Sequence, residues 1–248
     1  MIDLHFVYSP NGTKVAILLE ELGLEWRRIE YSIFEGRQLK PEFRALNPNN
    51  RLPVILDHAP DDGGPPHAVF ESGAILLYLA EKHGAFLGSA RRDRSRVQQW
   101  LMWQMAGLGP MQGQAHHFLR YAPSPIFYAI RRYINECNRL MDVMEHRLRE
   151  SAYLAGPDYS IADIACWPWI RAGRILELDM RDRPSLQGWY DRIAGRPAVE
   201  RAAELPASHM LNGPAMEKVA LSDEQWSNLF GANLLAAARP AQIAGDPA

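Results

Sequence analysis

The sequence has little cysteine, no excess of charge of either sign and no long apolar run. Two cysteines in 248 residues, Cys137 and Cys166, are too few for a disulfide framework. The net charge of −2 argues against general nucleic-acid binding, which needs positive charge concentrated on one face. The apolar stretch at residues 75–80 ends at Glu81 and is far shorter than the roughly 20 residues that span a bilayer. Because the N-terminus also lacks the layout of a signal peptide, these absences predict a soluble cytoplasmic protein without nucleic-acid or membrane partners.

Apolar residues make up 47% of the chain and charged residues 23%, which is typical of a folded globular protein. The first part of the chain, residues 1–85, changes repeatedly between the alternation of strands and the spacing of helices. Strands are predicted at residues 2–8, 25–31, 53–57 and 68–70, and helices at 13–22, 38–45 and 73–83. This order indicates a small α/β domain of thioredoxin type.

Residues 90–205 keep the helical period throughout, which predicts an all-helical second domain. A long helical pattern at 91–121 is interrupted by Gly109-Pro110, because proline breaks or kinks the hydrogen-bond ladder. Ser160 and Asp163 have the spacing of a capping box at the start of a later helix. Two more helices are predicted at 125–151 and 185–196.

The last part, residues 206–248, is rich in alanine and is broken by prolines. We expect a partly disordered C-terminal extension with one short amphipathic helix at 221–235 and a disordered end. The extension either covers a binding site or clasps a partner subunit, and the sequence does not decide between these roles.

The segment that joins the first strand to the first helix carries a hydroxyl and a carboxamide, at Ser9 and Asn11. Unpaired amides and aligned peptide dipoles make the start of a helix favourable for an anion, including a thiolate. Both side chains are able to donate a hydrogen bond to such a sulfur. Taken alone, however, the segment is explained more simply by two side chains that cap the helix.

Two further segments are suited to binding a small peptide. A cis bond at Leu52-Pro53 would leave the backbone of Leu52 free to pair with an extended ligand, but for this dipeptide alone we favour an ordinary trans proline. Glu71 and Ser72 lie at another helix start, where a carboxylate and a hydroxyl can hold the ammonium and carboxylate groups of a ligand. Helix capping explains Ser72 equally well.

The histidines and cysteines predict no chemistry of their own. His116 and His117 are adjacent, so on a helix they point about 100° apart and are poorly placed to share a metal. Cys137 and Cys166 lie inside predicted helices and are interpreted as apolar core residues. We therefore expect no metal and, since the chain has no Cys-x-x-Cys, no thioredoxin chemistry at its own thiols.

The order of these segments resembles the cytosolic glutathione transferases over about residues 1–205. Superfamily motifs are the Leu-Pro at 52–53, the Glu-Ser-Gly-Ala-Ile at 71–75 and the Ser-Ile-Ala-Asp at 160–163. The Pro-Asn-Gly at 10–12 and the Gly-Leu-Gly-Pro-Met at 107–111 are similar to the bacterial nu class, whose members act as glutathione-dependent disulfide-bond oxidoreductases. The resemblance implies the glutathione transferase architecture: a thioredoxin-like N-terminal domain and an all-α C-terminal domain, in a homodimer.

The resemblance also assigns roles to individual residues. It implies that Asn11, with Ser9 beside it, contacts the sulfur of glutathione and that Leu52 pairs with the cysteinyl backbone. Glu71 and Ser72 would hold the γ-glutamyl end. The other ligand contacts that it implies are those of Gln38, Arg51 and Arg132.

Three of these positions have a departure or an alternative. A threonine is common in the nu class where Ser9 stands, so the hydroxyl is kept without the methyl that restricts its rotamer. Arg51 replaces a frequent lysine and keeps the charge. Arg132 is expected to bind a glutathione carboxylate, and the alternative for it is a surface salt bridge.

The implied reaction uses the thiolate of bound glutathione, which attacks a disulfide through a mixed-disulfide intermediate. Because the protein supplies no thiol, a second glutathione must resolve the intermediate, so the site would hold two glutathiones or one glutathione disulfide. The same thiolate would also serve conjugation to an electrophile or reduction of a peroxide. Tyr8 offers the hydroxyl of a tyrosine-type transferase, but its alternation with Leu4 and Phe6 predicts that it faces the core. A non-catalytic glutathione-binding scaffold is the remaining alternative.

Overall fold

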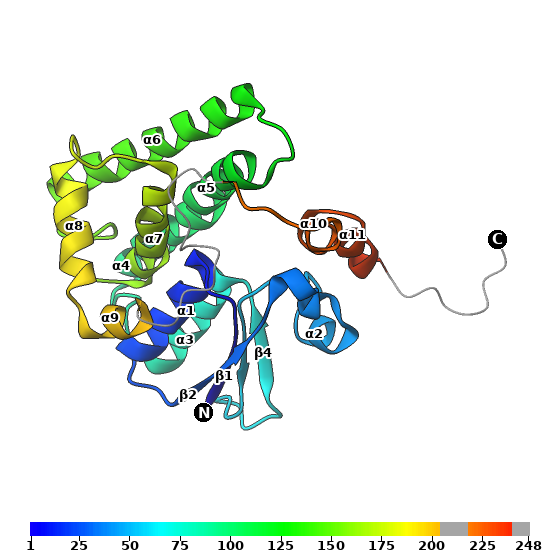
Figure 1. Ribbon diagram of the computed structural model, residues 1–248. Coiled ribbons are helices and arrows are strands. Elements are labelled where there is room, and N and C mark those ends of the chain that lie inside the picture. The colour runs from blue at the N-terminus through cyan, green and yellow to red at the C-terminus, as the bar shows by residue number, and fades with distance from the viewer. Residues whose placement is uncertain (204–217, 240–248) are drawn as a thin grey trace.

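The computed structural model describes residues 1–203 and 218–239, which form a sheet with flanking helices and a larger helical body beside it (Figure 1). The elements of the first part are β1 (Ile2–Phe6), α1 (Pro10–Glu21), β2 (Trp26–Glu30), α2 (Pro41–Leu46), β3 (Val54–Asp57), β4 (His67–Phe70) and α3 (Ser72–His83). The strands form one sheet in the order β2-β1-β3-β4, in which β1 is parallel to β2 and antiparallel to β3. The predicted thioredoxin-like fold is confirmed.

The first part is built around β1 and α1. β1 is buried along its whole length because β2 and β3 pair with its two edges and helices cover both faces of the sheet (Figure 1). The apolar stripe of α1, residues 15–19, is fully buried, and each large side chain in it contributes roughly 1.5–3 kcal/mol by leaving water. α1 and α3 lie on the side of the sheet that faces the helical body, whereas α2 lies on the other side (Figure 1). This arrangement places the starts of α1 and α3 next to the helical body.

The helical body forms the second part, as predicted. Its elements are α4 (Arg91–Trp103), α5 (Gly109–His116), α6 (Phe127–Glu150), α7 (Ile161–Gly173), α8 (Pro184–Ala194) and α9 (Pro197–Ala203). The expected interruption at Gly109-Pro110 takes the form of a π-helical turn, η3 (Gln104–Leu108), directly before α5. Since proline has no N–H to donate, a wider turn before it keeps the chain helical instead of ending the helix.

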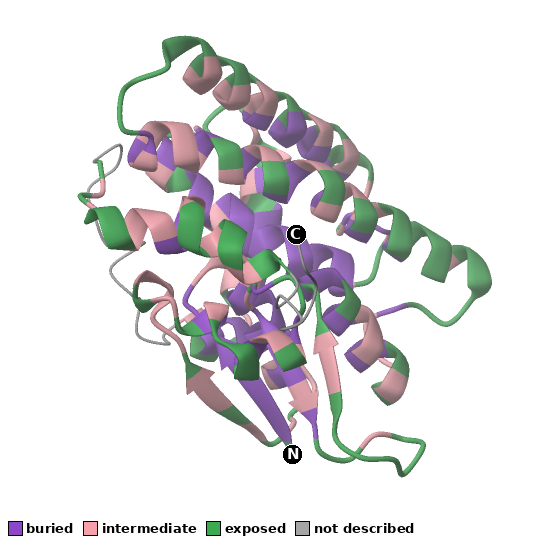
Figure 2. Cartoon of the chain, turned by 90° about the vertical axis from the view of Figure 1, so that its right-hand side faces the viewer, coloured by how far each residue is buried: buried purple, intermediate pink, exposed green. Residues whose placement is uncertain are grey.

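α7 joins the two parts, because it packs against both α1 and the surrounding helices of the second part. Its capping box is present as predicted: Ser160 Oγ accepts from the N–H of Ala162 at 3.3 Å, and Asp163 Oδ2 accepts from the N–H of Ser160 at 3.1 Å. Asp163 Oδ1 also accepts from Trp189 Nε1 at 2.9 Å. Figure 2 shows the buried residues continuing from the sheet into the central helices, so the two parts share one core.

The C-terminal extension returns to the first part. The predicted single helix is two short helices, α10 (Asp223–Phe230) and α11 (Ala232–Ala238), because Gly231 interrupts the helical backbone between them. Asn228 Nδ2 donates to the carbonyl of Phe34 at 2.8 Å, and Arg44 donates to the carbonyl of Arg239 at 2.8 Å. The extension thus lies across the first part. The end of the chain that was expected to be disordered, and the link at 204–217, lie outside the described residues.

Two predicted boundaries differ from the structure at the first helix. β1 ends at Phe6 rather than at Tyr8, and α1 begins at Pro10 rather than at Thr13. Proline suits the first turn because its fixed φ is helical and its missing N–H would have been unpaired there.

None of the described helices is both long enough and apolar enough to cross a membrane.

Candidate functional site

Two adjoining cavities lie where the first part meets the helical body and the extension. The sheet-side compartment, of about 320 Å³, contains every predicted site residue except Arg132, namely Ser9, Asn11, Gln38, Arg51, Leu52, Glu71 and Ser72. The helix-side compartment, of about 750 Å³, is bounded by α1, α5, α7 and α10. The two share five lining residues, so they form one site: Asn11, Arg51, Glu71, Met105 and Leu229.

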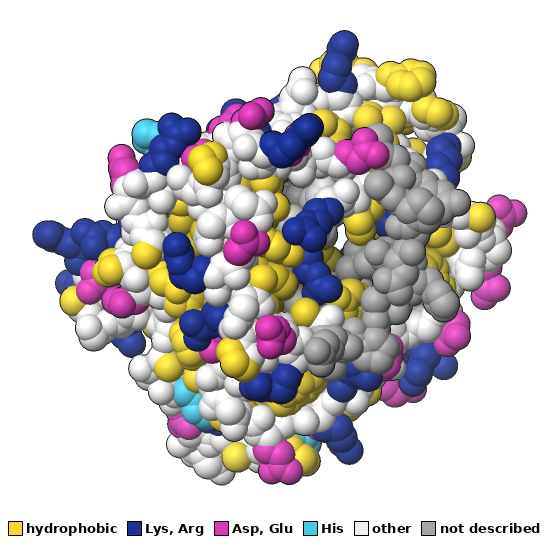
Figure 3. Space-filling view, turned by 60° about the vertical axis from the view of Figure 1, so that its left-hand side comes forward, with side chains coloured by type: hydrophobic (Ala, Val, Ile, Leu, Met, Phe, Trp, Pro, Cys, Tyr) yellow, Lys and Arg dark blue, Asp and Glu magenta, His cyan; other side chains and the backbone are white. Residues whose placement is uncertain are grey.

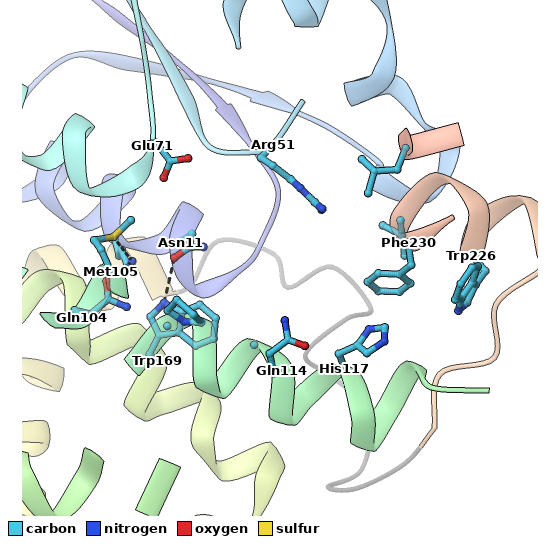
Figure 4. A pocket seen from close by; sticks show the side chains of 16 residues that line it. Asn11, Arg51, Glu71, Gln104, Met105, Gln114, His117, Trp169, Trp226 and Phe230 are labelled. Atoms are coloured by element: carbon cyan, nitrogen blue, oxygen red, sulfur yellow. Dashed lines mark hydrogen bonds between the residues drawn. The ribbon is translucent and has the colours of Figure 1, made fainter. Parts of the chain in front are cut away.

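The start of α1 provides a donor that faces this site. Trp169 Nε1 on α7 donates to Asn11 Oδ1 at 3.1 Å, which fixes the amide so that its nitrogen points into the cavity (Figure 4). Asn11 Nδ2 makes no hydrogen bond with the described residues. A donor at the positive end of a helix dipole favours a bound anion.

Ser9 acts as the helix cap in this structure. Its Oγ accepts from the N–H of Gly12 at 3.2 Å and donates to the carbonyl of Val7 at 3.3 Å. Gly12 has no room for a side chain, since a Cβ there would lie 2.5 Å from the same carbonyl. The capping interpretation is therefore confirmed for Ser9, whereas the side chain of Asn11 bonds to Trp169.

The loop before β3 presents free backbone groups to the sheet-side compartment. The Leu52-Pro53 bond is cis, so the trans bond that we favoured for this dipeptide is wrong. The N–H and C=O of Leu52 make no hydrogen bond within the described part of the chain. Asn47 holds the loop in place, because its Nδ2 donates to the carbonyl of Arg51 at 2.7 Å and its Oδ1 accepts from the N–H of Asn49 at 2.8 Å.

Gln38 and Asn50 bring unpaired acceptors to the same compartment. Gln38 is buried and donates through Nε2 to the carbonyl of Ile33 at 3.2 Å. Asn50 Nδ2 donates to the carbonyl of Gln38 at 2.9 Å. The side-chain oxygens of Gln38 and Asn50 have no partner among the described residues. A buried acceptor without a partner is costly, so a ligand that supplies N–H donors would satisfy both.

The start of α3 differs by one residue from the prediction. Glu71 is the N-cap residue, with φ 69° and ψ 116°, and Ser72 is the first helical residue. The expectation that Ser72 caps the helix is wrong, because its Oγ accepts from Lys14 Nζ at 3.3 Å. A non-glycine residue at positive φ costs roughly 1–3 kcal/mol and is common at binding sites. The carboxylate of Glu71 faces the cavity (Figure 4), and its Oε1 lies 3.5 Å from Asn49 Nδ2.

The helix-side compartment has an apolar outer wall that the sequence did not indicate. His117 on the helix that continues α5 packs edge-on against Phe230 of α10, with ring centroids 4.6 Å apart. Trp226, Leu229 and Leu234 complete this wall. No local pattern shows where a short helix will dock, so the prediction left the role of the extension open. In the structure the extension covers the site.

Several candidate residues lie outside both compartments. Arg132 is on α6, with 56% of its side chain exposed, 3.9 Å from Glu136. Burial lowers the pKa of His116 to about 4, and no cluster of metal-binding side chains occurs in the described ranges. Cys137 and Cys166 are free and buried, as predicted, and burial raises the pKa of both thiols.

Two family models match the chain: the N-terminal domain of glutathione S-transferase at residues 8–82 and the C-terminal domain at residues 131–197. Disulfide-bond oxidoreductase YfcG of Escherichia coli (strain K12) is 51% identical over 202 residues, which cover 82% of this chain and 94% of YfcG. The chain belongs to the glutathione S-transferase family. This confirms the family predicted from the motifs.

Other members of the glutathione S-transferase family support this assignment. Disulfide-bond oxidoreductase YghU of the same bacterium is 37% identical over 88% of this chain and 78% of YghU. A glutathione transferase of Burkholderia graminis with two glutathione molecules bound per subunit has a TM-score of 0.76 and 40% identity, over 83% of this chain and 88% of that one. One of Pseudomonas putida with a glutathione disulfide bound per subunit has a TM-score of 0.77 and 38% identity, over 83% and 92%.

The extension is the part of this glutathione S-transferase that lies beyond the family models. The match to the C-terminal domain ends at residue 197, whereas α10 begins at Asp223. The polar groups of the sheet-side compartment therefore lie within the matched N-terminal domain, whereas all the residues of the outer apolar wall, His117 included, lie outside both matched ranges.

Proposed function

We propose that the protein is a glutathione-dependent disulfide-bond oxidoreductase that uses the thiol of bound glutathione in place of a protein cysteine. The observation that carries this proposal is the amide of Asn11, which Trp169 fixes with a free N–H at the start of α1. Both protein thiols are buried, so neither is available as the nucleophile. The names of YfcG and YghU support the same activity.

In the proposed complex, glutathione lies in the sheet-side compartment with its γ-glutamyl end at the start of α3. The start of α3 suits the γ-glutamyl end, because the carboxylate of Glu71 can hold the ammonium group and Ser72 with the helix dipole can hold the α-carboxylate. The free backbone of Leu52 would pair with the cysteinyl residue. Gln38 would accept a hydrogen bond from the peptide, and Arg51, between the compartments, would provide positive charge for a carboxylate.

The sulfur would then lie at the start of α1. A free thiol with a pKa near 8.5 is mostly protonated at neutral pH, and lowering it by one unit takes about 1.4 kcal/mol. A hydrogen bond from Asn11 to the thiolate together with the helix dipole is sufficient for this. Ser9 would add a second donor only when its hydroxyl turns away from the carbonyl of Val7.

The reaction proceeds by two exchanges. The glutathione thiolate attacks one sulfur of the substrate disulfide and forms a mixed disulfide, while the other substrate sulfur leaves as a thiolate and is protonated. A second glutathione thiolate attacks the glutathione sulfur of this intermediate and releases the second substrate thiol. Two glutathione thiols are thereby oxidised to glutathione disulfide, and one substrate disulfide is reduced to two thiols. The two adjoining compartments provide room for both glutathiones.

A variant without cysteine tests the central claim. We expect Cys137→Ala combined with Cys166→Ala to reduce a small disulfide, in the presence of glutathione, within about threefold of the parent rate, because neither thiol reaches the site. Circular dichroism would show that the variant is folded. Loss of nearly all activity in a folded variant would contradict the proposal.

The alternative reactions use the same thiolate and differ in the acceptor. Tyr8 is buried, and its hydroxyl lies 3.4 Å from the carbonyl of Ala203, which argues against a tyrosine-type transferase. Tyr8→Phe and Asn11→Ala, compared in reductase, conjugation and peroxidase assays, separate these reactions. For a non-catalytic scaffold, glutathione would bind without turnover, and calorimetric titration with glutathione disulfide establishes whether it binds at all.

We also propose that the protein is a cytoplasmic homodimer. The start of α6 carries exposed apolar side chains, with Phe127 79% and Tyr128 75% exposed, and apolar groups protrude at the top of the molecule, where α6 lies (Figure 3). Arg132 follows on the same helix and lines neither compartment of its own chain. A dimer that covers this surface would allow Arg132 to reach the neighbouring site, and analytical ultracentrifugation tests the assembly.

A further inference from the structure

Lys14 is a buried cation beneath the start of α3. It lies on α1, three residues after Asn11, and only 1% of its surface is exposed. Its Nζ lies 2.7 Å from Gln104 Oε1, 3.3 Å from Ser72 Oγ and 3.5 Å from Met105 Sδ. All three neighbours are uncharged, so Lys14 has no ion pair among the described residues.

This environment disfavours the charged form of the lysine. Burial lowers the pKa of Lys14 to about 7, and the smaller effects of Cys166 and Glu71 oppose the change. The thiol of Cys166, on α7, is neutral because burial raises its pKa. η3 contributes only the uncharged Gln104 and Met105. The carboxylate of Glu71, at the start of α3, is thus the one anion near Lys14 in the described part of the chain.

Ser72 connects Lys14 to the sheet-side compartment. Its Oγ accepts from the lysine, so its own hydrogen is free to be donated elsewhere. In the structure this hydroxyl lies 3.7 Å from the thioether of Met105, which is a weak acceptor. A carboxylate at the start of α3 would be a much stronger acceptor for the same hydrogen.

We propose that Lys14 is the positioning residue and counter-charge for the α-carboxylate of the γ-glutamyl group. This inference rests on the proposed binding of glutathione. The carboxylate accepts from the hydroxyl of Ser72, and the ammonium of Lys14 lies directly behind that hydroxyl. Lys14 therefore holds Ser72 in the orientation that donates to the ligand, and it takes up a proton when the carboxylate binds.

The sign of the pH dependence follows from this arrangement. In the free protein Lys14 loses its proton as the pH rises through about 7. An added carboxylate favours the charged form, so the pKa of Lys14 is higher in the complex than in the free protein. At a pH between these two pKa values, Lys14 therefore takes up a proton when the ligand binds. The affinity is then greatest below about pH 7 and falls as the pH rises through the pKa of the complex.

Calorimetric titration with S-methylglutathione tests the inference, since this ligand keeps the carboxylate but has no thiol to titrate. Measurements in two buffers of different ionisation enthalpy give the number of protons taken up. We expect proton uptake near neutral pH and a fall in affinity of roughly fivefold between about pH 6 and about pH 9. Lys14→Met should bind more weakly and keep only the smaller uptake and pH dependence that come from the ligand's own ammonium group. Lys40→Met, which removes an exposed lysine of the same domain, should behave like the parent.

The outcomes separate this inference from the proposed function. If the parent binds S-methylglutathione without proton uptake, or if a folded Lys14→Met variant takes up as many protons as the parent, Lys14 does not have this role and the proposed function stands. If the parent binds neither this ligand nor glutathione disulfide at millimolar concentration, the proposed function itself is wrong. Should Lys14→Met fail to fold, Ser72→Ala gives the same test, because the uptake should fall when the connecting hydroxyl is removed.

Discussion

The two sides of the site are held in place by different means. On the sheet side, polar groups are fixed by short-range hydrogen bonds of the loops themselves, such as those that Asn47 makes to Arg51 and Asn49. On the extension side, apolar rings of α10 are held by a few long-range bonds, among them that of Asn228 to Phe34 and that of Val219 to Arg120. The sheet side is therefore part of the N-terminal domain itself, whereas the extension side is formed by a C-terminal segment that docks onto that domain.

This difference indicates that the two sides of the site have different roles in binding. A side whose donors and acceptors are fixed in advance suits a ligand of constant structure, because no ordering is needed when the ligand binds. An apolar side on a short appended segment distinguishes ligands by size and shape only, with modest energies. We therefore expect sheet-side variants to affect every substrate and extension-side variants to affect only some.

The largest effect should come from the donor at the start of α1. Asn11→Ala removes a hydrogen bond to a charged sulfur, worth about 1.5–3 kcal/mol, so kcat/KM at neutral pH should fall roughly ten- to hundredfold for every disulfide tested. Because the pKa of the bound thiol rises in the variant, the loss should shrink at high pH. A pH–rate profile measures both effects. An unchanged profile would mean that Asn11 does not contact the sulfur.

A smaller effect should follow from the residue that orients this donor. Trp169→Phe keeps an aromatic ring, although a smaller one, but removes the hydrogen bond to Asn11, worth about 1 kcal/mol, so kcat/KM should fall roughly fivefold. In the Asn11→Ala background the same change should have little further effect, because the two residues act as a unit. Steady-state kinetics of the two single variants and the double variant give this coupling. If the losses of the two single variants add up in the double variant, Trp169 does not act through Asn11.

The smallest effect on glutathione should come from the extension. Phe230→Ala opens the apolar wall opposite the sheet side, so the affinity for the glutathione in the sheet-side compartment should change less than about twofold. For acceptors with bulky apolar groups we expect KM to change by about threefold or more, in either direction. A series of aliphatic and aromatic disulfides, assayed with Leu235→Ala as a control on the exposed face of α11, measures the selectivity. If Phe230→Ala changes KM equally for all acceptors, the extension side does not select among substrates.

Sequence patterns predicted the parts of the fold that depend on neighbouring residues. The cap at Ser9 and the capping box at Ser160 are local, since the donor and acceptor lie within three residues of each other. The cis bond at Leu52-Pro53 was not predictable from the dipeptide, because trans is the more stable form for most X–Pro bonds. The predicted cap at Ser72 is wrong, because α3 begins one residue earlier and the hydroxyl of Ser72 contacts Lys14, 58 residues away in the sequence.

The parts of the site that the sequence did not reveal depend on distant contacts. Lys14 has the position of an ordinary residue in the first helix, and it is buried among residues distant in sequence, such as Gln104, 90 residues away. Trp169 lies in a motif that also contains Trp167, and only the packing of α7 on α1 shows which ring faces the site. The site residues predicted from the family resemblance lie together, with the exception of Arg132.

The burial of both cysteines has a consequence for the durability of the protein. A catalytic thiol that is over-oxidised to a sulfinic acid is in most cases lost for good, and the enzyme with it. Here the vulnerable atom belongs to a diffusible tripeptide, so a damaged sulfur departs and an intact one replaces it. In the proposed reaction, over-oxidation of a bound glutathione therefore leaves the protein intact, because another glutathione takes its place.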